Sequence, residues 1–206
     1  MDVSPKRIGI MGGSFNPIHK AHCSMAECFV SEVNCDVCYF IPSAVSPLKQ
    51  VDFTVSSEHR LAMLALATKD NPLFKVSDVE ILRGGISYTI DTVTWFQSQF
   101  PTSSLFLLIG ADQALVFNRW KQWENILRSV QLCIIPRDEI NDKEYISNNL
   151  TICSKKPLWL NCPIIRQSST VIRENIKLNK PVSNFLSQEV AEYIYRNRLY
   201  TSPNES

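Results

Sequence analysis

The sequence concentrates its histidines in one short segment, IGIMGGSFNPIHKAH (residues 8–22). Two of the three histidines in the chain, His19 and His22, are three residues apart and would share one face of a helix. Imidazoles titrate near neutral pH, and a neighbouring polyphosphate favours their charged form. Such a pair could hold phosphates while negative charge develops in a transition state. The alternatives are two exposed or capping histidines, or a zinc pair, although the remaining histidine, His59, falls in a different predicted helix.

The residues around this pair predict a strand, a sharp turn and a helix. The segment 7–11, apolar after Arg7, indicates a short buried strand, and Gly12-Gly13 and Asn16-Pro17 are typical of turns. Apolar residues then recur every four positions, which predicts a helix over 19–33. Unpaired N–H groups and the positive end of the dipole make such a helix start a binding place for phosphate.

The rest of the chain alternates between predicted strands and helices. The predicted strands cover 7–11, 37–41, 74–81, 104–110 and 130–136, and the predicted helices cover 19–33, 58–69, 89–100, 168–177 and 187–198, with a polar surface helix near 137–150. This alternation indicates an α/β fold with a mostly parallel sheet. Without a repeat or a boundary signal, we expect a single domain over 1–206, with its motifs in a core at 7–178 and a C-terminal helical segment at 187–200.

Composition limits the partners and the compartment. The 206 residues carry a net charge of +1, which gives no electrostatic reason to expect a nucleic acid partner. No apolar run approaches the roughly 20 residues that span a bilayer, so we expect no membrane partner and a cytoplasmic location. The seven cysteines are an odd number, and we expect free thiols. The single C-x-x-C, Cys35 to Cys38, has no matching ligands for zinc, so we expect no metal held by protein residues.

Two motifs resemble those of a known superfamily. GGSFNPIHKAH (12–22) resembles the G-x-F-[DN]-P-x-H-x-G-H signature of the nucleotidylyltransferases, relatives of the class I aminoacyl-tRNA synthetases, and SSTVIR (168–173) resembles their downstream motif. The resemblance implies a Rossmann-like, doubly wound fold with helices on both faces of the sheet. It also implies ATP binding by Gly12, Gly13, Ser14, Phe15, His19, His22, Ser169, Thr170 and Arg173. Ser169 and Thr170 at a helix start can cap the helix and bind phosphate oxygens, and the fork of Arg173 would clamp the phosphates.

Three further stretches, 80–93, 105–127 and 190–200, resemble the bacterial nicotinate-nucleotide adenylyltransferase family of NAD synthesis. That resemblance assigns Ser87, Tyr88, Thr89 and Trp120 to the pyridine nucleotide, and Lys49, Gly110 and Asp112 to ATP. Trp123 would belong to the core. Three residues depart from the family pattern: Ala21 between the histidines, Leu48 before the lysine, and Gln167 before the Ser-Ser-Thr motif.

The resemblance implies a magnesium-dependent transfer of the adenylyl group from ATP to nicotinate mononucleotide, giving deamido-NAD and pyrophosphate. His19, His22 and Arg173 would be catalytic. Two alternatives remain open: another superfamily enzyme with a phosphopantetheine, nicotinamide mononucleotide or cytidylyl substrate, or a non-catalytic nucleotide-binding module. A homo-oligomer is also compatible with the sequence. Taken one at a time, Asp112 could be a helix cap, Arg173 a solvated charge, Trp120 a core residue, and residues 87–89 only a turn.

Overall fold

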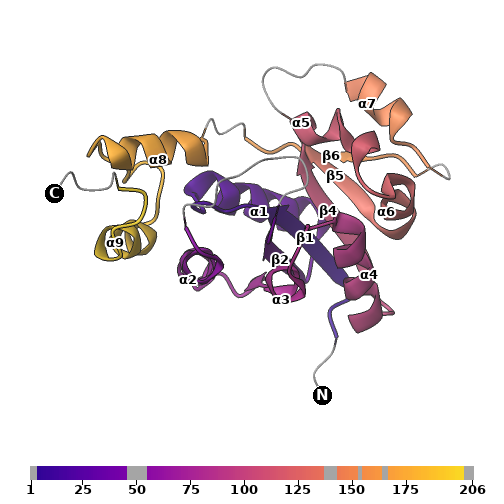
Figure 1. Cartoon of the computed structure of the whole chain (residues 1–206). Helices are drawn as coiled ribbons and strands as arrows, with labels where there is room; N and C mark the ends of the chain where they lie inside the picture. The colour runs from indigo at the N-terminus through magenta and orange to yellow at the C-terminus, as the bar shows by residue number, and fades with distance from the viewer. Residues whose placement is uncertain (1–3, 46–54, 137–142, 153–154, 164–166, 202–206) are drawn as a thin grey trace.

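A single parallel sheet forms the centre of the molecule. The computed structural model describes residues 4–45, 55–136, 143–152, 155–163 and 167–201 (Figure 1). The strands are β1 (Arg7–Gly13), β2 (Val37–Pro42), β3 (Phe74–Val76), β4 (Ser104–Gly110), β5 (Gln131–Ile135) and β6 (Leu158–Trp159). Their order is β3-β2-β1-β4-β5-β6, with every named strand pair parallel. The order reverses between β1 and β4, as in a doubly wound Rossmann-like sheet.

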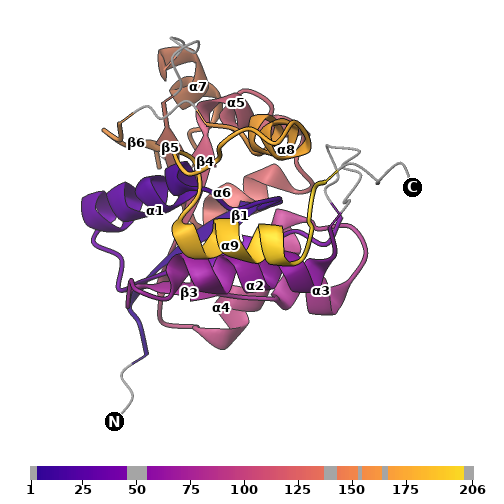
Figure 2. The ribbon, with the colours of Figure 1, turned by 90° about the vertical axis from the view of Figure 1, so that its left-hand side faces the viewer.

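Helices cover both faces of this sheet. They are α1 (Lys20–Val33), α2 (Ser57–Thr68), α3 (Val79–Arg83), α4 (Thr89–Gln99), α5 (Ala111–Ala114), α6 (Trp123–Ser129), α7 (Lys143–Asn149), α8 (Ser169–Lys177) and α9 (Gln188–Arg196), with a 3-10 turn at Phe117–Arg119. Figures 1 and 2 show α2, α8 and α9 on one side of the sheet and α4 and α6 on the other. The predicted fold class is therefore confirmed. None of the helices in the described ranges is long and apolar enough to cross a membrane.

Side chains alternate along the strands and divide the core in two. Ile8 and Ile10 of β1 belong to the cluster that includes α4 and α6, whereas Met11 belongs to the cluster of α1, α2, α8 and α9. Between them, Gly9 permits close packing of α1, because a Cβ there would lie 2.7 Å from the ring of Phe29. Two apolar layers thus fix the carboxyl ends of the strands, near which the motif residues lie.

The strand predicted over 74–81 is wrong beyond Val76. The chain leaves the sheet there and forms α3, in which Glu80 is buried and accepts a 2.6 Å hydrogen bond from the Thr92 hydroxyl of α4. In a strand the Glu80 side chain would point to one face of the sheet, whereas in α3 it points at the Thr92 hydroxyl. The alternation of apolar and polar residues in this segment breaks at Ser77-Asp78, directly after the strand ends. The predicted polar surface helix is present as α7 within its described part.

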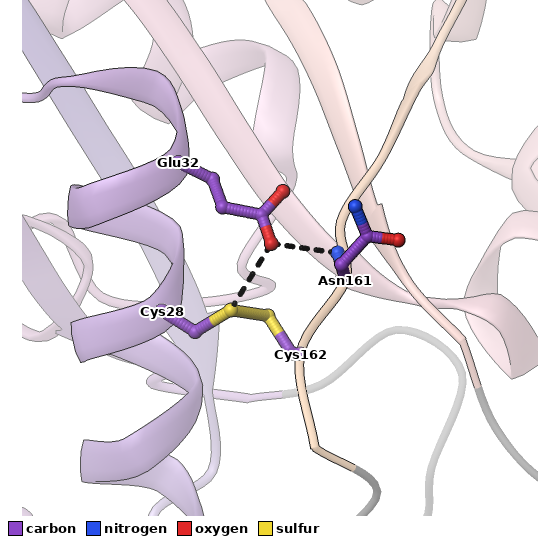
Figure 3. The surroundings of a disulfide bond; sticks show 4 residues. All are labelled: Cys28, Glu32, Asn161 and Cys162. Carbon is purple, nitrogen blue, oxygen red and sulfur yellow. Dashed lines mark hydrogen bonds between the residues drawn. A yellow bond between two sulfur atoms is a disulfide. The ribbon is translucent and has the colours of Figure 1, made fainter.

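The prediction that all cysteines are free thiols is wrong for two of them. Cys28 of α1 and Cys162 form a disulfide with a Cα–Cα distance of 5.7 Å (Figure 3). Beside it, Glu32 Oε1 accepts a 2.7 Å hydrogen bond from the Asn161 amide. The 134-residue separation between the two cysteines concealed their pairing. In the described part of the chain Cys23, Cys35, Cys38 and Cys133 remain free thiols.

Candidate active site

The switch point of the sheet is open to a ligand. β1 and β4 are adjacent and end at Gly13 and Gly110, and ligands of such sheets bind beyond the carboxyl ends of the strands at this point. Apart from Gly12 itself and its two chain neighbours, no described heavy atom lies within 4 Å of the position that a Cβ on Gly12 would take, and Gly12 is exposed. A nucleotide could therefore approach the backbone closely at Gly12.

The turn that follows β1 is fixed from three other parts of the chain. Phe15 is buried with a left-handed φ of 45°, and the Asn16-Pro17 bond is cis. Four side chains bond to the turn: Arg60 of α2 to the Ser14 carbonyl (3.0 Å), Arg173 and Ser169 of α8 to the Asn16 (2.7 Å) and Pro17 (2.9 Å) carbonyls, and Tyr200 to the Asn16 side chain (2.6 Å). The turn is thus a junction between the two sequence motifs.

The two histidines contact each other at the start of α1. His19 is the N-cap and only 5% exposed, and its ring stacks on that of His22 with a centroid distance of 3.7 Å. The His19 amide donates to His22 Nδ1 at 3.3 Å. Because Nδ1 accepts, the proton of a neutral His22 lies on Nε2. Phe15 packs edge-on against the same ring at 5.1 Å. His22 therefore has a fixed orientation in which Nε2–H is its donor.

The expectation of unpaired amides at the start of α1 is wrong. The amides of Lys20, Ala21 and His22 donate to the Phe185 carbonyl (2.8 Å), Gln167 Oε1 (3.1 Å) and the His19 carbonyl (2.9 Å). Ala21 and Gln167 are two of the departures from the family pattern, and they contact each other. Phosphate binding at this helix start would therefore depend on side chains and the helix dipole rather than on these amides.

The Ser-Ser-Thr motif begins α8, but its first serine is the cap. Ser168 Oγ accepts the Val171 amide at 3.2 Å, so the prediction that Ser169 or Thr170 caps the helix is wrong. The Ser169 hydroxyl instead donates to the turn after β1. Thr170 is exposed, and its hydroxyl accepts from Nη2 of the half-buried Arg173 at 3.2 Å. Because Ser168 is the cap, the Ser169 hydroxyl bonds to the turn and the Thr170 hydroxyl to the guanidinium.

The residues predicted for the pyridine nucleotide surround the start of α4. Tyr88 is its N-cap and Thr89 its first residue, and no described residue accepts from the Thr89 or Ile90 amide. Ser87 is buried, and its hydroxyl accepts the Ala44 amide at 2.8 Å, so it joins the loop after β2 to α4. Trp120 is half-buried, and its buried Nε1 has no partner among the residues described.

Of the remaining predicted residues, the structure describes Gly110, Asp112 and Trp123 but not Lys49. Gly110 ends β4, and Asp112 in the first turn of α5 is half-buried with Oδ2 accepting from the Gln113 amide group at 3.0 Å. Trp123 packs against the core, as predicted. Lys49 and the neighbouring Leu48 lie outside the described residues.

Four residues that contact the turn after β1, the start of α1 or the start of α4 were assigned no role from the sequence. They are Arg60, Lys121, Gln167 and Tyr200. Arg60 is 2% exposed and donates to the Ser14 and Ser43 carbonyls, at 3.0 and 2.8 Å. Burial lowers the pKa of its guanidinium. Arg60 lies three and four residues before the buried Met63 and Leu64, on the same face of α2. An arginine on an apolar helix face could have indicated a buried role from the sequence.

Lys121 lies beside the start of α4. Its Nζ is 4.3 Å from the ring centroid of Tyr88 and 3.7 Å from Asp91 Oδ1. The segment that follows Trp120 therefore brings a positive charge to the same helix start. This contact joins two parts of the chain that the resemblance assigns to one ligand.

Cys23 follows the second histidine but is not an activated nucleophile. Burial, together with the charge of Glu27, raises the pKa of its thiol to about 11. The thiol consequently stays protonated at neutral pH, and only thiolates react readily.

Comparisons with known proteins agree with this geometry. The cytidylyltransferase-like family model matches residues 10–175. Nicotinate-nucleotide adenylyltransferase of Bacillus subtilis is 34% identical over 198 residues, which cover 96% of this chain and 100% of that protein. A probable nicotinate-nucleotide adenylyltransferase of Lachnoclostridium phytofermentans is 31% identical, over 95% and 99% of the two chains. The structure of Plasmodium falciparum nicotinic acid mononucleotide adenylyltransferase complexed with NaAD shares the fold, with a TM-score of 0.75, 20% identity and coverage of 95% and 97%.

Proposed function

The chain belongs to the nicotinate-nucleotide adenylyltransferases of the cytidylyltransferase-like family, and we propose how its own residues carry out that reaction. A phosphate oxygen of nicotinate mononucleotide attacks the α-phosphorus of ATP. The bond to the β-phosphate breaks, and deamido-NAD and pyrophosphate form. The nucleophile is already an anion, so no general base is required, and catalysis depends on positioning and charge stabilisation.

One observation carries the assignment of the ATP site: the two motifs, distant in sequence, meet at the turn after β1. Arg173 bonds to the Asn16 carbonyl at 2.7 Å and Ser169 to that of Pro17 at 2.9 Å. We therefore assign ATP to the open switch point beside them. The full set of proposed ATP residues is Gly12, Gly13, Ser14, Phe15, His19, His22, Lys49, Gly110, Asp112, Ser169, Thr170 and Arg173.

The two histidines have different proposed roles. His22 donates from Nε2 to the phosphates, because its Nδ1 is already an acceptor for the His19 amide. His19 is buried under it and supports the ring by stacking at 3.7 Å. Arg173 neutralises the phosphates from the other side of the turn through its remaining N–H groups. These three residues are the proposed catalytic set.

The nicotinate carboxylate is assigned to the start of α4. The Thr89 and Ile90 amides donate to no acceptor in the described part of the chain, and the dipole of an eleven-residue helix favours an anion there. Lys121 adds a positive charge at the same place. Tyr88 and Trp120 would flank the pyridine ring, and Ser87 holds the segment in position.

Magnesium would enter with ATP. The described part of the chain offers one cluster of three potential ligand residues, Cys28, Glu32 and Cys162, whose two sulfurs form the disulfide. Mg²⁺ requires oxygen ligands and commonly takes them from substrate phosphates and water. Bound in that way, it would offset the charge of the leaving pyrophosphate. We further propose a single functional unit over 1–206 that works in the cytoplasm.

The test is an acceptor comparison. The purified protein is mixed with ATP, Mg²⁺ and, separately, nicotinate mononucleotide, nicotinamide mononucleotide or phosphopantetheine, and pyrophosphate release is followed. We expect nicotinate mononucleotide to give the highest kcat/KM. A higher value for either other acceptor would reassign the substrate, and no release with any of the three would indicate a non-catalytic module.

A further inference from the structure

Tyr200, close to the end of the chain, is buried against the first motif. Tyr200 is 6% exposed and Asn16 is 1% exposed. The Tyr200 hydroxyl donates to Asn16 Oδ1 at 2.6 Å, across 184 residues of sequence. This is a short hydrogen bond for an O–H donor, and both partners are shielded from water. The end of the chain is thereby connected to the turn that follows β1.

The backbone of the same asparagine anchors Arg173. The Asn16 carbonyl accepts from Arg173 Nη1 at 2.7 Å, so Tyr200, Asn16 and Arg173 form one continuous chain of contacts. Burial raises the pKa of Tyr200 well above its ordinary value, although the guanidiniums of Arg173 and Arg60 act in the opposite direction. Tyr200 consequently remains protonated, and its hydroxyl remains a donor, throughout the neutral and mildly alkaline range.

The other contacts to this turn do not involve the Asn16 side chain. Arg60 bonds to the Ser14 carbonyl and Ser169 to the Pro17 carbonyl. Among the described residues, Tyr200 is the one that bonds to the Asn16 amide group. The preceding residue, Phe15, has a left-handed φ of 45°, a conformation that a non-glycine residue keeps only when its surroundings enforce it.

We propose that Tyr200 is a positioning residue for ATP: by fixing Asn16 it fixes the carbonyl that anchors Arg173, and so the place where the guanidinium meets the phosphates. Tyr200 acts through other residues and contacts no reacting atom. This inference rests on the proposed function insofar as Arg173 binds ATP. It goes beyond the sequence motifs, since it assigns a role to Tyr200, which lies beyond α9.

The first experiment compares Tyr200→Phe with a matched control. The substitution keeps the ring and removes only the hydroxyl. We expect kcat/KM for ATP to fall by about three- to tenfold, the factor that the loss of one neutral hydrogen bond gives, while KM for nicotinate mononucleotide changes by less than a factor of about two. Tyr195→Phe on α9, where the side chain is 52% exposed, should leave both values unchanged. An unchanged ATP profile for Tyr200→Phe overturns the proposal.

A double-mutant cycle separates positioning from general loss of folded protein. If Tyr200 acts through Arg173, Tyr200→Phe has little further effect on kcat/KM for ATP in an Arg173→Lys background. If the two substitutions reduce kcat/KM for ATP by independent factors that multiply, the proposal is overturned. It is also overturned if Tyr200→Phe lowers only kcat, in proportion to the folded fraction measured by thermal unfolding.

Calorimetric binding of ATP to the wild type and to Tyr200→Phe needs no acceptor. Weaker binding by Tyr200→Phe supports positioning even if nicotinate mononucleotide proves to be the wrong substrate. Equal binding overturns positioning alone, and no binding to the wild type overturns positioning together with the ATP site.

Discussion

At the scale of single residues, the geometry of His22 depends on the residue one helical turn before it. His19 supplies the amide that His22 Nδ1 accepts and the ring on which it stacks. A histidine that is free to rotate would exchange tautomers and orientations, whereas this one has its donor defined in advance. Preorganised donors are effective because they do not reorganise when charge develops. The buried His19 can therefore contribute to turnover by orienting His22 in addition to its proposed place in the ATP site.

We expect His22→Ala to lower kcat by about 10²–10³, the usual effect of losing one preorganised charge-stabilising donor. The thermal unfolding temperature should change little, since His22 is only half-buried. Steady-state kinetics at saturating substrates provide the measurement. His59→Ala, which removes a histidine bonded to Tyr193 away from the motif, is the control. Turnover of the His22 variant within a few-fold of the control would remove His22 from the catalytic set.

Arg173→Lys should raise KM for ATP at least tenfold or lower kcat to a similar degree. The guanidinium bonds to the Asn16 carbonyl and to Thr170 Oγ1 at the same time, and an ammonium keeps the charge without the fork. Initial rates over a range of ATP concentrations test this expectation. KM for nicotinate mononucleotide serves as the internal reference and should stay nearly constant. An ATP profile identical to the wild type would make Arg173 a structural contact only.

At the scale of elements, two helix starts differ in what they offer a ligand. The first amides of α1 are bonded to Phe185, Gln167 and His19, so α1 contributes side chains. The first two amides of α4 have no acceptor in the parts of the chain described, so α4 contributes its backbone. A carboxylate can satisfy such donors with two oxygens, whereas a carboxamide presents an NH₂ group to one of them.

This difference predicts a preference for the acid substrate over its amide. Hydrogen bonds to a charged group contribute about 1.5–3 kcal/mol, against about 1 for neutral ones, so kcat/KM for nicotinate mononucleotide should exceed that for nicotinamide mononucleotide at least tenfold. Lys121→Met should reduce this ratio, because it removes the charge beside Tyr88. The exposed Lys180→Met is the matched control. Equal values for the two mononucleotides would show that the start of α4 does not read the carboxylate.

Elements with a clear period were predictable from the sequence, and contacts between distant elements were not. The first strand and the helix after His19 were indicated by local patterns, and both are present, but β1 continues through Gly12 and Gly13, which were expected to form a turn. The short elements between Ala111 and Ser129 are too brief to show a period, and none was predicted. The disulfide and the bond between Tyr200 and Asn16 depend on tertiary packing across 134 and 184 residues, which no local pattern encodes.

At the scale of the whole molecule, covalent and hydrogen-bonded links join α1 to the segment that leads into α8. Near the start of α1 the links are Gln167 to Ala21 and Ser169 to Pro17. Further along the same helix the link is the disulfide between Cys28 and Cys162. The disulfide closes a loop that contains β2 to β6 but not β1, so it restricts the unfolded chain over most of its length.

Closing a loop of this length is expected to stabilise the fold by about 5 kcal/mol in the chain-entropy model. We therefore expect a reductant, or Cys28→Ser, to lower the unfolding temperature by roughly 10–20 °C, since each kcal/mol corresponds to about 2–4 °C in a protein of this size. Thermal unfolding with and without reductant is the measurement, and Cys28→Ser is its control because reductant should not destabilise that variant further.

Thiol counting in denaturant gives an independent check: of seven cysteines two are bonded, which leaves five reactive thiols without reductant and seven with it. Seven thiols without reductant, together with an unfolding temperature that ignores reductant, would contradict the disulfide and return all cysteines to the free state expected from composition.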